Sequence, residues 1–160
     1  METKDKAPRW AILVGSGFGT GYCPVAPGTA GALLALLVWI GVDLLFPGSA
    51  SWWTALALSL VFLPAGAVAS GCLESWWGKD PSRVTIDEMV GTWLALLAVP
   101  SGQFWAAVGA FALFRLFDIY KPLGIRAMEK IRGGWGIMMD DVLAGIYSSV
   151  TITLALCIIR

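Results

Sequence analysis

Residues 89–117, MVGTWLALLAVPSGQFWAAVGAFALFRLF, decide how this chain can fold. The stretch is apolar enough for a membrane, but it is longer than the roughly 20 residues of one spanning helix and too short for two full ones. Pro100, Ser101 and Gly102 interrupt it, and residues of these types favour turns. The stretch therefore predicts a helical hairpin that turns at residues 100–102, with arms of reduced length.

The composition of the whole chain also favours a membrane as its surroundings. Hydrophobic residues make up 58% of the 160 residues, charged residues 14%, and the mean hydropathy is +0.75. An ordinary soluble domain carries about 25% charged residues, so a soluble chain of this composition would struggle to cover its surface. Three further apolar segments each fit one span: Thr29–Phe46, Trp52–Ala69, in which Pro64 predicts a kink, and Val142–Ile159.

Together these segments predict an all-α integral membrane bundle with three full spans plus the helical hairpin. The bundle would be a single domain over residues 1–160, with residues 1–9 flexible. The alternative is a soluble helical bundle in which the paired tryptophans pack in the core, because tryptophan suits a protein interior as well as a membrane interface.

Lysine and arginine are distributed very unevenly over this predicted topology. With the N-terminus in the cytoplasm, the outer turns 47–51 and 100–103 contain neither residue, and only Arg160 falls outside. Because positive residues accumulate on the cytoplasmic side, the N-terminus and the active face are predicted to be cytoplasmic. The cations on that side are Lys4, Lys6, Arg9, Lys79, Arg83, Lys121, Arg126, Lys130 and Arg132, with Arg115 near it.

Several classes of function are excluded by what the sequence lacks. The formal net charge is zero, so no basic field favours nucleic acid. Histidine is absent, which excludes zinc sites built on histidine, Ser-His-Asp triads and phosphohistidine mechanisms. The three cysteines contain no CxxC pair and predict no disulfide framework. No feature indicates an obligate protein partner.

Most carboxylates of the chain gather in polar segments on the predicted cytoplasmic side, near the membrane ends of the helices. Carboxylates in one place repel each other unless cations hold them, and Mg²⁺ takes oxygen ligands from carboxylates and substrate phosphates. The sequence therefore suggests a Mg²⁺ site. The candidate ligands are Asp87, Glu88, Asp118, Asp140 and Asp141.

Each of these carboxylates also has a purely structural explanation. Residues 85–88 fit a capping box with Thr85 as the N-cap. Asp140 and Asp141 fall where acidic residues favour the start of a helix. The charged residues at three-residue spacing within 115–121 could pair along one helix face.

A glycine-rich segment, residues 15–31, and nearby cations suggest a phosphate site. Glycine lets backbone N–H groups approach an anion, and a helix that begins at Thr29 presents an electropositive N-terminus. The segment is neither GxGxxG, because Thr20 replaces the third glycine, nor a Walker loop. A flexible turn, and contact between the cations and lipid headgroups, are the structural alternatives. The candidate substrate contacts are Thr20, Thr29, Arg115, Lys121 and Arg126.

Acids, cations and a glycine loop at a membrane surface suggest metal-dependent phosphoryl chemistry. The sequence contains neither a cysteine-phosphatase loop nor the Asp-x-Asp-x-Thr motif of aspartyl-phosphate phosphatases. The rival hypothesis is a small membrane transporter or channel with an acidic cytoplasmic vestibule. It would need ionisable residues deep in the spans, and the only candidates, Asp43 and Arg115, lie near span ends.

Four blocks of the sequence resemble the phosphatidylglycerophosphatase A family and occur in that family's order. They are GFGTGYCPVAPGTAG (17–31), IDEMVGTW (86–93), FRLFDIYKPLGIR (114–126) and GGWGIMMDDVLAGIY (133–147). The chain departs from the family pattern at Gly124 and Glu129, where proline and aspartate are usual. The resemblance implies an all-α, Mg²⁺-dependent phosphatase, and the distribution of lysine and arginine predicts that it lies in the bacterial cytoplasmic (inner) membrane. It would hydrolyse the phospholipid phosphatidylglycerophosphate to phosphatidylglycerol and phosphate.

The resemblance also suggests roles for individual carboxylates. Asp140 and Asp141 are expected to be metal ligands or to orient the attacking water, and Asp87 is a further catalytic candidate. Because histidine is absent, either a carboxylate acts as the general base or the metal activates the water.

Overall fold

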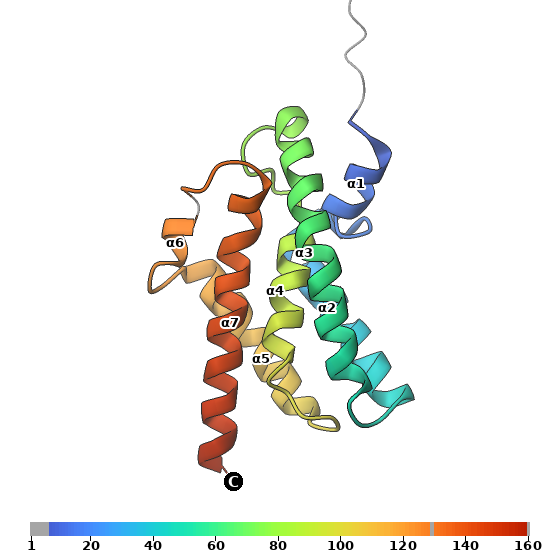
Figure 1. Cartoon of the computed structure of the whole chain (residues 1–160), viewed down its shortest axis with the longest axis vertical. Helices are drawn as coiled ribbons and strands as arrows, with labels where there is room; N and C mark the ends of the chain where they lie inside the picture. The colour runs from blue at the N-terminus through green and yellow to red at the C-terminus, as the bar shows by residue number, and fades with distance from the viewer. Residues whose placement is uncertain (1–6, 129, 160) are drawn as a thin grey trace, which may run out of the picture.

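The computed structural model describes residues 7–128 and 130–159. Residues 1–6, which make up most of the segment expected to be flexible, lie outside this part, as do Glu129 and Arg160. The described residues contain helices and no strand, which confirms the all-α class (Figure 1). The elements are α1 (Arg9–Gly15), the 3₁₀ turn η1 (Thr20–Tyr22), α2 (Pro27–Leu45), α3 (Ala50–Trp77), α4 (Ile86–Leu96), α5 (Phe104–Tyr120), α6 (Ile125–Met128) and α7 (Gly134–Ile159).

Three of these helices, α2, α3 and α7, are long and apolar enough to cross a membrane. They correspond to the three predicted spans, although α3 and α7 extend beyond the predicted bounds, and Pro64 lies inside α3. Their outward faces carry exposed apolar side chains, which suit contact with lipid tails rather than water. Examples on α3 and α7 are Leu60, Val61, Val68, Ile146, Val150 and Leu154.

The predicted hairpin is confirmed: α4 and α5 are antiparallel helices joined by a turn at residues 97–103, in which Gly102 has a φ of +79°. The first arm of the hairpin, α4, lies inside the bundle. Helix α4 packs against α2, α3, α5 and α7, and Ile86, Val90 and Leu96 are fully buried. The short arm of the hairpin is therefore the central element of the bundle.

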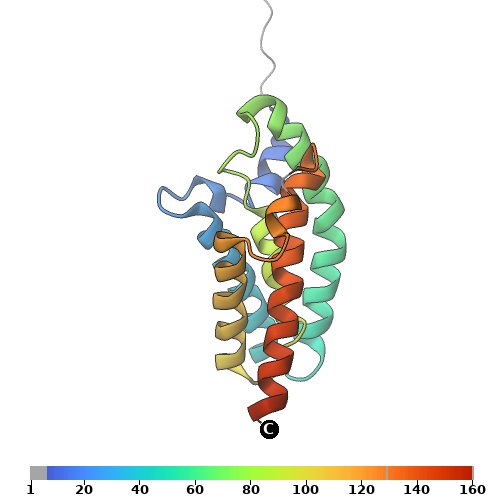
Figure 2. The ribbon, with the colours of Figure 1, turned by 90° about the vertical axis from the view of Figure 1, so that its left-hand side faces the viewer.

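The loops gather at two opposite ends of the bundle (Figures 1 and 2). The α2–α3 and α4–α5 turns meet at one end, where the Gly48 N–H donates to Ser101 Oγ at 3.0 Å. The other end carries α1, the loop after α3, α6 and the start of α7. This end holds most of the lysine and arginine residues within 7–128 and 130–159, as the charge pattern predicted.

Helix α7 begins at Gly134, almost two helical turns before Asp140. The interpretation of Asp140 and Asp141 as residues at a helix start is therefore wrong. The reason is packing: a Cβ at Gly134 would lie within 3.0 Å of the Ala67 carbonyl oxygen on α3. Glycine weakens a helix in general, but here it allows the first turn of α7 to reach the backbone of α3.

Candidate active site and metal centre

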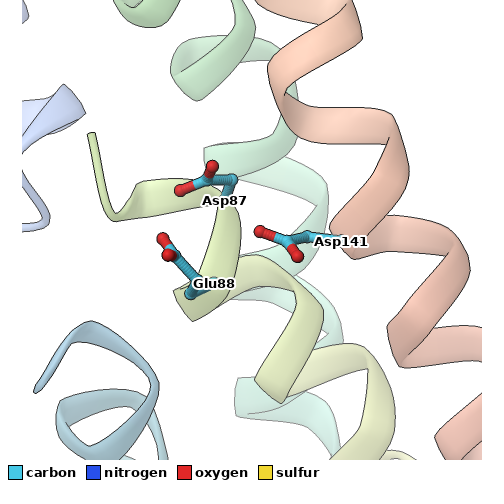
Figure 3. A group of neighbouring side chains, drawn as sticks. All are labelled: Asp87, Glu88 and Asp141. Atoms are coloured by element: carbon cyan, nitrogen blue, oxygen red, sulfur yellow. The ribbon is translucent and has the colours of Figure 1, made fainter. Parts of the chain in front are cut away.

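Three carboxylates form the centre of the site. Asp87 and Glu88 lie in the first turn of α4, and Asp141 approaches them from α7 (Figure 3). One oxygen atom from each side chain lies within 4.8 Å of the other two. We call these three residues the acidic cluster.

Two glycines bring α4 and α7 close enough to form the acidic cluster. A Cβ at Gly91 would lie 2.8 Å from the Asp141 carbonyl oxygen, and a Cβ at Gly145 would lie 2.5 Å from the Gly91 carbonyl oxygen. Any larger residue would separate the helices. Sequence reasoning did not identify these two positions, although a glycine in a helix interior is a signal of close packing.

The acidic cluster has buried oxygen atoms for which the described residues offer no hydrogen-bond donor. Asp87 Oδ1, Glu88 Oε2 and Asp141 Oδ1 are inaccessible and have no hydrogen-bond partner. Buried polar groups are almost always paired, and an unpaired buried charge is costly. Three neighbouring carboxylates with such oxygens offer the kind of ligand that a hard divalent cation prefers.

Burial disfavours the charged forms of Asp87 and Glu88. Burial raises the pKa of Asp87 well above its usual value, and the charges of Glu88 and Asp141 raise it further. Burial likewise raises the pKa of Glu88, although the Arg115 guanidinium opposes this shift. A cation held among these oxygens would stabilise their charged forms.

Arg115 connects Asp118 to the acidic cluster. Its Nη1 donates to Asp118 Oδ2 at 2.6 Å and lies 4.0 Å from Glu88 Oε1. The predicted pairing along the helix face is thus confirmed for Arg115 and Asp118. The Nε of Arg115 is buried without a partner, so this guanidinium keeps a donor for a further acceptor.

Asp140 forms an ion pair beside the acidic cluster. Lys121 Nζ donates to Asp140 Oδ2 at 2.6 Å, whereas Asp140 Oδ1 is buried without a partner. Lys121 follows the last residue of α5 and has a φ of +48°, and Pro122 prevents the helix from continuing. The end of α5 therefore directs a cation toward α7.

The glycine-rich segment contacts the start of α4 through two threonines. The Thr20 and Thr85 hydroxyl groups lie 2.8 Å apart, and the Thr20 hydroxyl also donates to the Ser16 or Gly17 carbonyl. Thr85 precedes α4 but makes no side-chain capping bond. The capping-box interpretation of residues 85–88 is therefore wrong, because a tertiary partner takes the Thr85 hydroxyl.

The N-terminus of α2 lies against the site. A Cβ at Gly28 would lie within 3.0 Å of Glu88 Oε1 and 3.4 Å from Arg115 Nη2. Thr29 follows in the first turn and is half-buried. The N–H groups of a first helical turn favour anions, so this geometry fits the expected phosphate contact at Thr29. Arg126, the remaining candidate, is exposed on α6.

Comparisons with known proteins agree on one family. The family model for phosphatidylglycerophosphatase A matches residues 13–156. Two proteins named phosphatidylglycerophosphatase A are similar to this chain. The Escherichia coli protein is 33% identical over 143 residues, which are 88% of this chain and 79% of that protein. The Haemophilus influenzae protein is 38% identical over 141 residues, covering 88% and 85% of the two chains.

A protein of Bacteroides thetaiotaomicron is also similar, with 57% identity over 146 residues. The match covers 90% of this chain and 92% of that protein, which is provisionally named a phosphatidylinositol-3-phosphatase. No solved structure matches the chain.

Proposed function

The chain belongs to the phosphatidylglycerophosphatase A family, and on this premise we propose that its substrate is phosphatidylglycerophosphate. As a member of this family it is a phosphatase that acts on a phosphate monoester. The observation that carries the choice of substrate is the family match over residues 13–156, which includes every carboxylate of the acidic cluster. Family membership favours this enzyme over the transporter hypothesis.

We propose that the enzyme depends on Mg²⁺. The residues fit this ion, because the acidic cluster offers three oxygens within 4.8 Å of one another, with buried lone pairs that lack a protein partner. Asp87, Glu88 and Asp141 would hold the ion, and Asp118 and Asp140 stand beside them. When bound, Mg²⁺ supplies positive charge that stabilises the phosphoryl oxygens and favours deprotonation of water.

The remaining steps rest on the protein's own side chains. Asp140 is held by Lys121 through Oδ2, and its Oδ1, which is buried without a partner among the described residues, would orient a water molecule and take its proton. The water oxygen bonds to phosphorus, the bond from phosphorus to the glycerol oxygen breaks, and the proton returns from Asp140 to that leaving oxygen. Phosphatidylglycerol and phosphate are the products.

Cations and backbone groups would hold the phosphate during this reaction. Arg115 retains an unpartnered Nε, Lys121 lies next to Asp140, and the first turn of α2 brings N–H groups and Thr29 to the site. Thr20 and Arg126 would complete the contacts to the headgroup. Charge on the phosphoryl group persists into the transition state, so these contacts would lower the barrier as well as bind substrate.

We propose that the site faces the cytoplasm in the cytoplasmic membrane. The concentration of cations at the end of the bundle that carries the acidic cluster supports this orientation. Cysteines introduced at Ser101 and Lys130 should label from opposite sides of the membrane. A cysteine at Ser49 should label from the same side as one at Ser101, and labelling of Ser101 and Lys130 from one side would refute the topology.

A second candidate substrate is phosphatidylinositol 3-phosphate. The observation that favours it is the provisional name of the relative with 57% identity. Both lipids carry a phosphate monoester on a polyol headgroup, so the same acidic cluster could serve either one.

The test is phosphate release by the purified protein from each lipid in mixed micelles, with no other protein present. We expect kcat/KM for phosphatidylglycerophosphate to exceed that for phosphatidylinositol 3-phosphate by about tenfold or more. The reverse ratio would assign the second substrate instead. Release from neither lipid, by protein that remains folded, would refute the proposed function.

A further inference from the structure

A polar pocket of about 720 Å³ lies next to the acidic cluster, at the same end of the bundle. It is bounded by the end of α3, the loop that follows it, the segment before α7 and the first two turns of α7. Its charged lining consists of Lys79, Lys130, Arg132, Glu74, Asp80 and Asp140.

Gly133 and Gly136, the first and last residues of the segment GGWG, line one wall of this pocket. Gly133 has a φ of +76°, which turns the chain into α7. A Cβ at Gly136 would lie within 3.0 Å of the Ile131 carbonyl oxygen, so only glycine lets the segment fold back onto the helix. The fold thus places Lys130 and Arg132 over the first turns of α7.

The pocket meets the catalytic site at Asp140. Asp140 lines the pocket, its Oδ2 accepts a hydrogen bond from Lys121 Nζ at 2.6 Å, and its Oδ1 is buried. Because Asp140 is the proposed general base, a ligand bound in this pocket would lie beside the reaction centre.

The remaining lining is suited to a ligand with two kinds of polar group. Lys79, Lys130 and Arg132 offer donors to phosphate oxygens. Glu74 and Asp80 are acceptors, which repel phosphate but accept hydrogen bonds from hydroxyl groups. Inorganic phosphate alone would leave these carboxylates unused, whereas a phosphorylated polyol satisfies both sets.

We propose that this pocket binds the phosphorylated polyol headgroup of the lipid, with Lys130 and Arg132 on oxygens of the phosphate diester that joins the headgroup to the lipid and Asp80 on a hydroxyl group. The phosphate monoester would lie at the acidic cluster. The proposal rests on the proposed function, but it holds for either lipid, because both headgroups combine a phosphate with hydroxyls. It makes the pocket the element that distinguishes a headgroup from free phosphate.

The experiment measures competition by soluble headgroups against hydrolysis of the micellar lipid by the full chain. Glycerol 3-phosphate, inositol 3-phosphate and inorganic phosphate are the competitors. In the wild type, at least one polyol phosphate should inhibit about tenfold more strongly than inorganic phosphate. The variant Lys130→Met/Arg132→Met should raise KM and the inhibition constant of that polyol phosphate about tenfold, because each lost contact is a charge-assisted hydrogen bond.

Two further variants separate this role from general effects of charge. Arg83→Met removes one positive charge, where the double variant removes two, from a side chain that lies over the Tyr22 and Trp77 rings, and it should leave KM and inhibition near their wild-type values. Asp80→Asn should reduce the preference for the polyol phosphate over inorganic phosphate. Asn tolerates the positive φ of 49° at this position, so the backbone should not change.

The outcomes are distinguishable from failure of the proposed function. Equal inhibition by all three competitors, or equal KM values for the double variant and Arg83→Met, would overturn the headgroup assignment while leaving the phosphatase intact. If neither lipid is hydrolysed, calorimetric titration of the wild type and the double variant with glycerol 3-phosphate still tests the pocket. Absence of binding to the wild type would then overturn the proposal.

Discussion

The two ends of the bundle use the same chemical group, a carboxylate, in opposite ways. At the end formed by the turns, Asp43 is fully engaged: its Oδ1 accepts from Ser51 Oγ at 2.9 Å and its Oδ2 accepts from the Gly102 N–H at 2.8 Å. At the other end, the acidic cluster keeps buried oxygens for which the described residues offer no partner. A carboxylate that has hydrogen-bond partners within the protein stabilises the fold, whereas a buried carboxylate without such partners is suited to bind a ligand.

The partners of Asp43 also weaken the transporter hypothesis, which needs ionisable residues that act in transport. Asp43 was one of two candidates for such a role, but its bonds join the α2–α3 turn to the α4–α5 turn. Arg115, the other candidate, is held by Asp118 and Glu88. Both residues have partners that account for their positions.

Removal of the metal should have the largest effect on the catalytic end. Excess chelator should abolish phosphate release, and added Mg²⁺ should restore it, because the single charge of Arg115, 4.0 Å from Glu88 Oε1, cannot neutralise three buried carboxylates. Mg²⁺ should also raise the melting temperature of the wild type, since a ligand that binds the native state stabilises it. Full activity in excess chelator would show that the unpartnered oxygens are not a metal site.

Removal of one carboxylate charge from the acidic cluster should have the second largest effect on catalysis. Asp141→Asn and Asp87→Asn preserve shape, and each should lower kcat/KM by about 10²-fold or more. Neither variant should melt below the wild type in the absence of Mg²⁺, because each removes repulsion between buried like charges. A loss of stability in parallel with activity would instead assign these residues a structural role, like that of Asp43.

Gly28→Ala tests whether the position of Glu88 matters as well as its charge. The added Cβ would displace the Glu88 carboxylate, whose Oε1 lies against Gly28. We expect a loss of about tenfold in kcat/KM, since small displacements at a catalytic centre are costly. The melting temperature should stay unchanged or rise, because alanine favours a helix more than glycine does. Ala30→Gly in the same turn is a control for helix stability, and it should lower the melting temperature without this loss of activity.

The sequence was sufficient to predict the elements whose signals are local. The length of the stretch 89–117 and its Pro-Ser-Gly interruption predicted the hairpin, and the positions of the acids at helix ends predicted that they would converge. The start of α7 was not predictable in this way, because the glycines of GGWG are typical of a loop. Gly134 lies in a helix instead, where its lack of a Cβ lets it approach the Ala67 carbonyl oxygen on α3. Local composition cannot report such a tertiary contact.

The division of roles between neighbouring acids was also beyond the sequence. Successive residues of a helix point about 100° apart, so Asp141 faces α4 while Asp140 faces Lys121. Whether Asp140 or Asp141 points toward the acidic cluster depends on the rotation of α7 about its axis. The contacts of Gly91 and Gly145 between α4 and α7 set this rotation. For the same reason Thr85 matched a capping pattern but bonded to Thr20 across the fold.

The smallest expected effect is at Asp43, and it is the sharpest test of the comparison. Asp43→Ala removes the acceptor for Ser51 and Gly102 and should destabilise the protein by about 1 kcal/mol, equivalent to a melting temperature lower by about 2–4 °C. Activity at a temperature where the variant is folded should equal that of the wild type. Ser49→Ala, in the same turn but without a capping bond, should change neither quantity. If Asp43→Ala instead lowered kcat/KM at constant stability, the turn end would be coupled to catalysis, and partnered and unpartnered carboxylates would no longer separate structure from function in this protein.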